Sequence, residues 1–104
     1  VKAKLKKIKI YMSLINFGEV IYITERELGI EVAQSTIALI EQLPIELIEI
    51  DKKLTLSTAH IKANYKLSYA DAFAAATARE KSAILVTGDP EFKTLKDAID
   101  LMWI

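Results

Sequence analysis

The stretch from residue 67 to 92, LSYADAFAAATAREKSAILVTGDPEF, constrains the fold more than any other part of the chain. Ser68 has the character of a helix cap, and the alanine-rich segment after it allows close packing against a sheet. Ala83 to Thr87 is a short apolar run that ends at a glycine, which is typical of a buried strand. Asp89 and Pro90 then resemble an N-cap followed by a helix-starting proline. We therefore predict a helix, a buried strand and a second capped helical turn.

The same alternation of short β-branched runs and amphipathic segments extends over the whole chain. Ser13 is expected to cap a helix that Gly29 stops, and Asp51 is expected to cap another. Strands separated by helical crossovers imply a mainly parallel sheet in a three-layer α/β/α arrangement, built as one domain over residues 1–104. The predicted strands are 8–12, 45–50, 83–87 and 101–104, and the predicted helices are 14–28, 30–43, 52–65, 71–79 and 91–98.

The composition excludes several classes of site. The chain has 14 Lys and Arg against 14 Asp and Glu, so the molecule as a whole does not attract nucleic acid, and any RNA contact must be local. It has no cysteine, which excludes disulfides and thiolate metal sites, and the single His60 cannot build a zinc site alone. No apolar run is long enough to cross a bilayer. We expect a cytoplasmic protein without a membrane segment.

Three acids are predicted to gather at one edge of the sheet. Glu19, Asp71 and Asp89 each follow a predicted strand or open a predicted helix, and ligands of open α/β sheets bind beyond the carboxyl ends of the strands. Crowded carboxylates repel one another unless a cation lies between them, and sites made only of oxygen ligands favour Mg²⁺ or Mn²⁺. This pattern predicts a site for a hard divalent cation.

Each acid also has a simpler interpretation. Asp71 completes an S-x-x-D capping box with Ser68, and Asp89 caps the last helix. Glu19 could lie on a solvated helix face, but it is part of the apolar run LINFGEVIYI, whose residues on both sides look buried. A carboxylate buried there is costly unless it is paired or bound to metal.

Three segments in order, SLINFGEV, LSYADAFAAATA and ILVTGDPEF, resemble the PIN-domain ribonucleases, and among them the VapC-like toxins of toxin–antitoxin pairs. The resemblance extends from about Ile8 to the C-terminus. It implies a PIN-like fold and cleavage of RNA with Mg²⁺ or Mn²⁺. It also implies that Glu19, Asp71 and Asp89 are the catalytic, metal-binding acids.

The resemblance implies further residues and partners. Glu91 is similar to an extra metal-binding acid of some members, Thr87 to a hydroxyl that supports the last aspartate, and Ser13 and Asn16 lie beside the glutamate. The implied partners are an RNA substrate, further copies in a homo-oligomer and an antitoxin protein. The candidates for RNA contact, chosen because they lie near the motif segments, are Lys66, Arg79 and Lys93.

One departure from the family pattern concerns the first strand. Similar PIN domains begin with a strand that ends in Asp-x-Ser and supplies a metal ligand, whereas this sequence has no Asp before Asp51. In the family that strand is the centre of a five-stranded sheet of order 3-2-1-4-5. Its absence is expected to separate strands 8–12 and 45–50 from strands 83–87 and 101–104, leaving edges that invite pairing with another chain.

Three explanations of the departure stay open: a truncated gene product, a proteolytic remnant, and a chain completed by a partner or swapped segment. The functional alternatives are a ribonuclease impaired by the missing acid and a non-catalytic module that self-associates or binds an antitoxin. A phosphate-binding domain similar to response regulators fits the order of motifs poorly.

Overall fold

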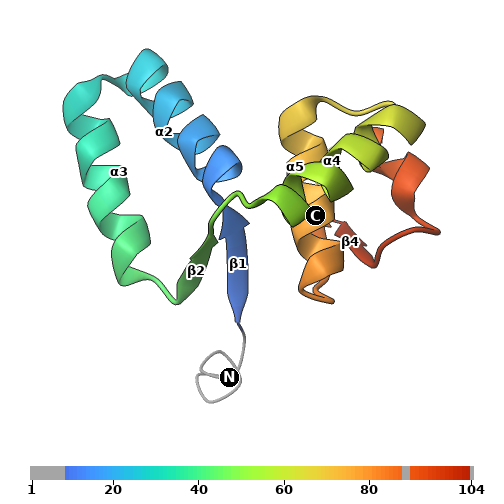
Figure 1. Ribbon diagram of the computed structural model, residues 1–104. Helices are drawn as coiled ribbons and strands as arrows, with labels where there is room; N and C mark the ends of the chain where they lie inside the picture. The colour runs from blue at the N-terminus through green and yellow to red at the C-terminus, as the bar shows by residue number, and fades with distance from the viewer. Residues whose placement is uncertain (1–8, 88–89, 104) are drawn as a thin grey trace.

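Helices and strands alternate along the chain in the predicted order (Figure 1). The computed structural model describes residues 9–87 and 90–103. The strands are β1 (Ile10–Ser13), β2 (Ile45–Ile48), β3 (Leu85–Thr87) and β4 (Leu101–Trp103). The helices are α2 (Leu14–Leu28), α3 (Ile30–Gln42), α4 (Lys52–Asn64), α5 (Tyr69–Glu80) and the 3₁₀ helix η1 (Pro90–Leu95).

Short polar side chains start three of the helices. The side-chain oxygens of Ser13, Asp51 and Ser68 each accept a hydrogen bond from the main-chain N–H three residues later, at 3.1, 2.8 and 3.1 Å. Each bond satisfies one of the N–H groups that a helix start leaves without a partner. The three predicted caps are confirmed.

Gly29 makes the turn between α2 and α3. Its φ of 96° is strained for any residue with a Cβ, and its N–H donates to the carbonyl of Glu25 at 2.8 Å. The predicted stop of the first helix at Gly29 is therefore confirmed. The chain reverses here, so that α2 and α3 form a helical hairpin (Figure 1).

Among the described residues the strands form two separate parallel pairs. Strand β1 pairs with β2 in the register Ile10 to Ile45, and β3 pairs with β4 in the register Leu85 to Leu101. No described strand joins the two pairs. This is the separation expected from the missing first strand of the family pattern.

The hydrophobic core lies in the second half of the chain. It is formed by α4, α5, η1 and the segment before β4, and its buried members include Leu54, Ile61, Phe73 and Leu95. The α2–α3 hairpin buries only Ala33 and Ile40 among its apolar residues.

The expectation that the residues around Glu19 are buried is wrong. No residue of α2 is buried, and Leu14, Ile15 and Val20 are between 37 and 40% exposed. The reason is that α2 packs on α3, on the β1–β2 pair and on α5 with only part of its surface, and no other described helix or strand covers the rest.

The last predicted helix, 91–98, is a 3₁₀ helix that ends at Leu95. Its buried residues, Phe92 and Leu95, are three positions apart, which places them on one face of a helix with three residues per turn. Burial of this face thus favours the tighter helix over the predicted α-helix. None of the helices within the described parts of the chain is long and apolar enough to span a membrane.

Candidate functional site

A hydrogen bond joins the beginnings of α2 and α5. The side-chain amide of Asn16, in the first turn of α2, donates to the main-chain carbonyl of Ala70, in the first turn of α5, at 2.9 Å. These residues are 54 positions apart in the chain. The bond therefore brings together two of the three segments that carry the predicted acids.

Ser13 orients the Asn16 side chain. Its hydroxyl accepts from the Asn16 N–H at 3.1 Å and donates to the Asn16 side-chain oxygen at 2.5 Å. Ser13 is only 1% exposed, so water does not compete for these bonds. With its oxygen held by Ser13, the amide of Asn16 directs its NH₂ group at Ala70.

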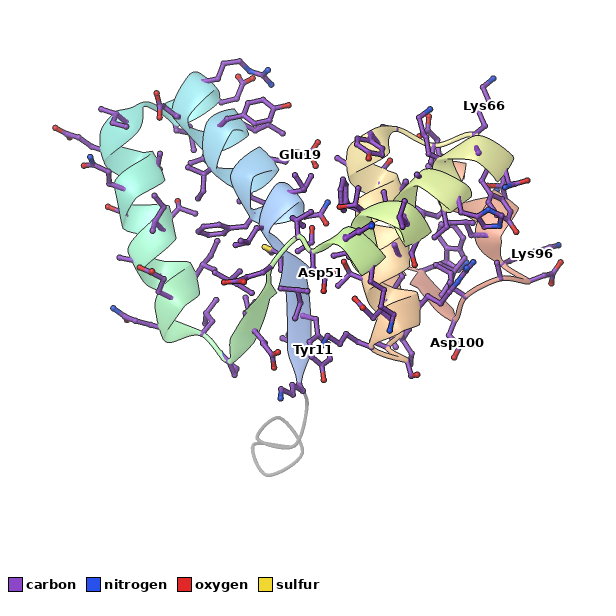
Figure 2. The ribbon with its side chains drawn as sticks, viewed as in Figure 1. Tyr11, Glu19, Asp51, Lys66, Lys96 and Asp100 are labelled. Carbon is purple, nitrogen blue, oxygen red and sulfur yellow. The ribbon has the colours of Figure 1, made fainter. Side chains whose placement is uncertain are left out.

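Glu19 lies one turn after Asn16 in α2. Residues three apart share a helix face, so Glu19 is placed on the side of α2 where Asn16 reaches α5. Figure 2 shows Glu19 on the side of α2 that faces α5. Its side chain is half-buried.

Asp71 directly follows Ala70 in the first turn of α5 and is also half-buried. Its N–H donates to the Ser68 hydroxyl at 3.1 Å. A carboxylate in a first turn interacts favourably with the helix dipole, which gives Asp71 a structural role of its own. Asp71 is thus in the turn of α5 that Asn16 contacts, and Glu19 lies one turn beyond Asn16 in α2.

The remaining predicted acids belong to the segment after β3. Asp89 lies outside the described residues. Thr87 is the last residue of β3, and Glu91 is an exposed residue of η1. Strand β3 contacts α5, the helix that carries Asp71.

The described residues supply two carboxylates to this region rather than a complete metal site. In ranges 9–87 and 90–103 there is no group of three or more His, Cys, Asp or Glu that could hold a metal ion. The available donors are carboxylate oxygens, the ligand type that Mg²⁺ and Mn²⁺ favour. The donor set thus fits a hard cation if Asp89 joins Glu19 and Asp71.

The three predicted RNA-contacting cations do not gather at one point. Lys66 is exposed in the loop before α5, and Lys93 is exposed on η1. Arg79 is in the last turn of α5, eight residues after Asp71 and so about 12 Å further along the helix axis. Figure 2 shows Lys66 pointing into solvent, well away from Glu19.

A PIN domain family model matches residues 1–98 of the chain. The chain belongs to the PIN domain family. Among curated proteins, none matches the chain significantly in sequence.

Solved structures of VapBC toxin–antitoxin complexes have the same fold as this PIN domain. VapBC2 of Rickettsia felis, bound to a DNA fragment from its promoter, has a TM-score of 0.77 at 21% identity, over 98% of this chain and 80% of that one. DNA-bound VapBC of Salmonella typhimurium has a TM-score of 0.75 at 21% sequence identity, and the match covers 89% of this chain and 74% of that one. A toxin–antitoxin complex from Klebsiella pneumoniae has a TM-score of 0.70 at 21% sequence identity, and the match covers 97% of this chain and 80% of that one.

Two residues that shape this region of the PIN domain could not be predicted from the sequence. The Ala70 carbonyl accepts the bond from Asn16, and Lys81 lies over the ring of Tyr11, 5.6 Å from its centroid. No sequence pattern marks an alanine carbonyl or a lysine at a helix end as a contact residue. These two make their contacts only because α5 packs on β1. Together they fix α5 along β1 at both ends.

Proposed function

We propose that this PIN domain is a metal-dependent endoribonuclease of the VapC toxin type, which hydrolyses RNA phosphodiesters in the cytoplasm. Membership of the PIN family supports the proposal. The structural observation that carries it is the hydrogen bond between Asn16 and Ala70, because this bond holds the first turn of α2, one turn before Glu19, against the turn of α5 that bears Asp71.

Glu19, Asp71 and Asp89 would hold Mg²⁺ or Mn²⁺, with Glu91 as a further acid nearby. A bound metal ion supplies polarisation of the phosphodiester and an activated water. Ser13 and Asn16 would support Glu19 indirectly, because their hydrogen bonds hold the start of α2 against α5. Thr87 is the proposed supporting residue for Asp89. Lys66, Arg79 and Lys93 are the proposed contacts to RNA phosphates.

Cleavage of a single-stranded RNA in Mn²⁺ tests the proposal. The substitutions Asp71→Asn and Glu19→Gln keep the size of each side chain and remove its charge. Each is expected to lower the rate about 100-fold or more, since even changes to groups behind metal ligands cost 10- to 100-fold. Chelation of the metal is expected to abolish cleavage.

The matched control is Asp97→Asn, which removes a charge from an exposed aspartate after η1. Asp97→Asn should leave the rate unchanged. Circular dichroism of each variant separates a lost site from a lost fold. An undiminished rate in folded Asp71→Asn would show that the assigned acids are not the metal site.

We propose an antitoxin as the protein partner, and a homo-oligomer as the assembly. The structural neighbours are toxin–antitoxin complexes. The α2–α3 hairpin exposes large apolar side chains, including Tyr22 at 54%, Leu28 at 66% and Leu39 at 57%. Exposed apolar surface of this kind is typical of protein–protein interfaces.

A non-catalytic interaction module is the second candidate. It is favoured by the two separate strand pairs among the described residues, whose edges are open to pairing with another chain. Calorimetric titration with Mn²⁺ distinguishes the two candidates. Binding that disappears in Glu19→Gln supports the nuclease, whereas no binding in the unmodified protein supports the module.

A further inference from the structure

The first turn of α5 carries an exposed aromatic side chain beside the proposed site. Tyr69 is 48% exposed, and it comes directly before Ala70, which Asn16 contacts, and two residues before Asp71. Two residues of a helix advance about 3 Å along its axis, close to the rise of about 3.4 Å between stacked nucleotides of one strand. Tyr69 and Asp71 are therefore within reach of neighbouring nucleotides of a single RNA strand.

The ring of Tyr69 is oriented by a contact with the core. It packs edge to face with Phe73, with ring centroids 5.0 Å apart and an angle of 64° between the planes, and Phe73 is only 3% exposed. Such pairs are favourable beyond the area that they bury. Because the rings meet edge to face and Tyr69 is half exposed, Phe73 does not cover both faces of the Tyr69 ring.

Helices α4 and α5 pack against each other in opposite directions. Lys53, in the first turn of α4, pairs with Glu80, the last residue of α5, at 3.9 Å. The end of α4 and the loop after it therefore lie beside the start of α5. Lys62 and Lys66, both exposed, are thus at the same end of α5 as Tyr69.

The neutral charge of the whole chain hides an uneven distribution. Between Asp51 and Asp71 the sequence has four lysines and no acid, whereas residues 14–51 contain eight acids and one arginine. All four lysines are exposed. The phosphates of RNA are therefore attracted to α4 and the loop before α5, and they are repelled by the α2–α3 hairpin.

This distribution favours one path for an RNA strand bound at the acids. In the view of Figure 2 the start of α5 lies between Glu19 and Lys66. On the other side of α2 the chain continues into α3, which belongs to the acidic hairpin. An RNA strand that leaves the acids across the start of α5 meets Tyr69 first and Lys66 next.

We propose that Tyr69 binds the substrate by stacking on an unpaired base next to the phosphodiester held at Glu19 and Asp71, while Lys66 contacts a phosphate further along the strand. Every base has a flat aromatic face, so this contact accepts any base. It selects unpaired RNA, because the bases of a duplex are stacked on one another. The inference rests on the proposed ribonuclease function and adds a residue that distinguishes unpaired from paired substrate.

The test measures RNA binding in EDTA, where metal-dependent cleavage does not occur. The probe is a short oligouridine RNA with one 2-aminopurine at its centre, whose fluorescence falls when the base stacks. We expect saturable binding with quenching by the unmodified chain. Tyr69→Leu should bind about 5- to 150-fold more weakly and without quenching, the range that a stacked aromatic contributes per base. Tyr69→Phe keeps the ring and should behave as the unmodified chain.

Tyr11→Leu is the matched control for loss of an aromatic ring. Tyr11 also lies under lysines, with Lys9 at 5.8 Å and Lys81 at 5.6 Å from its ring centroid, but it is beside the last residues of α5. Its replacement should leave binding and quenching unchanged. Circular dichroism checks that each variant is folded.

A probe with an abasic site in place of 2-aminopurine tests the contact without relying on the fold of a variant. The unmodified chain should bind this probe more weakly by the same factor that Tyr69→Leu costs. Tyr69→Leu should bind both probes equally, because the two changes remove one and the same interaction. A probe whose 2-aminopurine is paired in a duplex should show no quenching that depends on Tyr69.

Lys66→Ala tests the phosphate contact. It should lower the slope of log binding constant against log salt concentration by about 0.7, the value for one phosphate of a single strand. Lys96→Ala, at an exposed position after η1, should leave the slope unchanged.

The proposal is overturned if the RNA does not bind, or if Tyr69→Leu binds and quenches as the unmodified chain does. Cleavage in Mn²⁺ separates this failure from that of the proposed function. Cleavage by Tyr69→Leu with an unchanged KM contradicts the stacking contact alone, whereas a raised KM at similar kcat supports it. Quenching that depends on Tyr69, in a chain that cleaves no RNA, supports the stacking contact and contradicts the nuclease.

Discussion

The side-chain amide of Asn16 donates to the carbonyl of Ala70 at 2.9 Å, and this bond joins a turn of α2 to a turn of α5 across 54 positions of the chain. Both residues lie next to predicted acids, Glu19 one helical turn away and Asp71 adjacent. A carbonyl in the first turn of a helix accepts a hydrogen bond from the N–H four residues later. Its second lone pair remains available to accept from Asn16. The arrangement of the proposed site thus depends on a single polar contact between two helices.

Replacing Asn16 with alanine is expected to lower the free energy of unfolding by about 1–2 kcal/mol, because the part-buried hydroxyl of Ser13 and the Ala70 carbonyl both lose a partner. Urea denaturation measures the change. The control is Asn64→Ala, since Asn64 also donates its amide to a carbonyl, that of His60 at 2.9 Å, but on an exposed surface. A larger loss in Asn64→Ala would contradict the importance given to the contact between helices.

Replacing Ser13 with alanine is expected to cost more than replacing Ser68. Both hydroxyls cap a helix, which is worth about 1 kcal/mol, but Ser13 is 1% exposed and also donates to the Asn16 side chain. Thermal and urea unfolding of Ser13→Ala and Ser68→Ala measure the difference. Equal costs would mean that the second bond of Ser13 adds no stability.

Leu95→Ala is expected to destabilise the fold by about 2–5 kcal/mol, because Leu95 is fully buried at the end of η1 and its loss leaves a cavity in the core. Leu56→Ala is the control, since Leu56 is 59% exposed on α4. Its cost should stay within about 0.5 kcal/mol. Denaturant midpoints of the two variants give the comparison.

Glu46 is expected to titrate below the ordinary range of a glutamate. The hydrogen bond from Lys9, reinforced by the charge of Lys9, lowers the pKa of Glu46 in the folded state. A pKa that is lower in the folded state adds stability above the unfolded-state pKa, and this contribution disappears as the pH falls through the folded-state value. Because both side chains are exposed, the pKa itself is the quantity to measure, by NMR titration with Lys9→Met as the comparison. An unchanged Glu46 pKa in Lys9→Met would exclude Lys9 as the cause.

The helix starts could be predicted because they depend on local contacts. Ser13, Asp51 and Ser68 each bond an N–H only three residues away, and the φ of 96° at Gly29 is a property that a glycine permits wherever it occurs. The motifs around Glu19 and Asp71 could be recognised for the same reason, since each is a short segment. Membership of the PIN family agrees with that resemblance.

Contacts between distant segments could not be predicted from local sequence patterns. The sequence of α2 reads as a buried helix, yet no residue of α2 is buried, because burial depends on which elements arrive to cover it. The 3₁₀ form of η1 depends on the burial of Phe92 and Leu95 in the core. The choice of Ala70 as the partner of Asn16 exists only once α5 packs along β1. Local hydrogen bonds are encoded within a few residues, whereas these features require the free energy of packing segments that lie far apart in the chain.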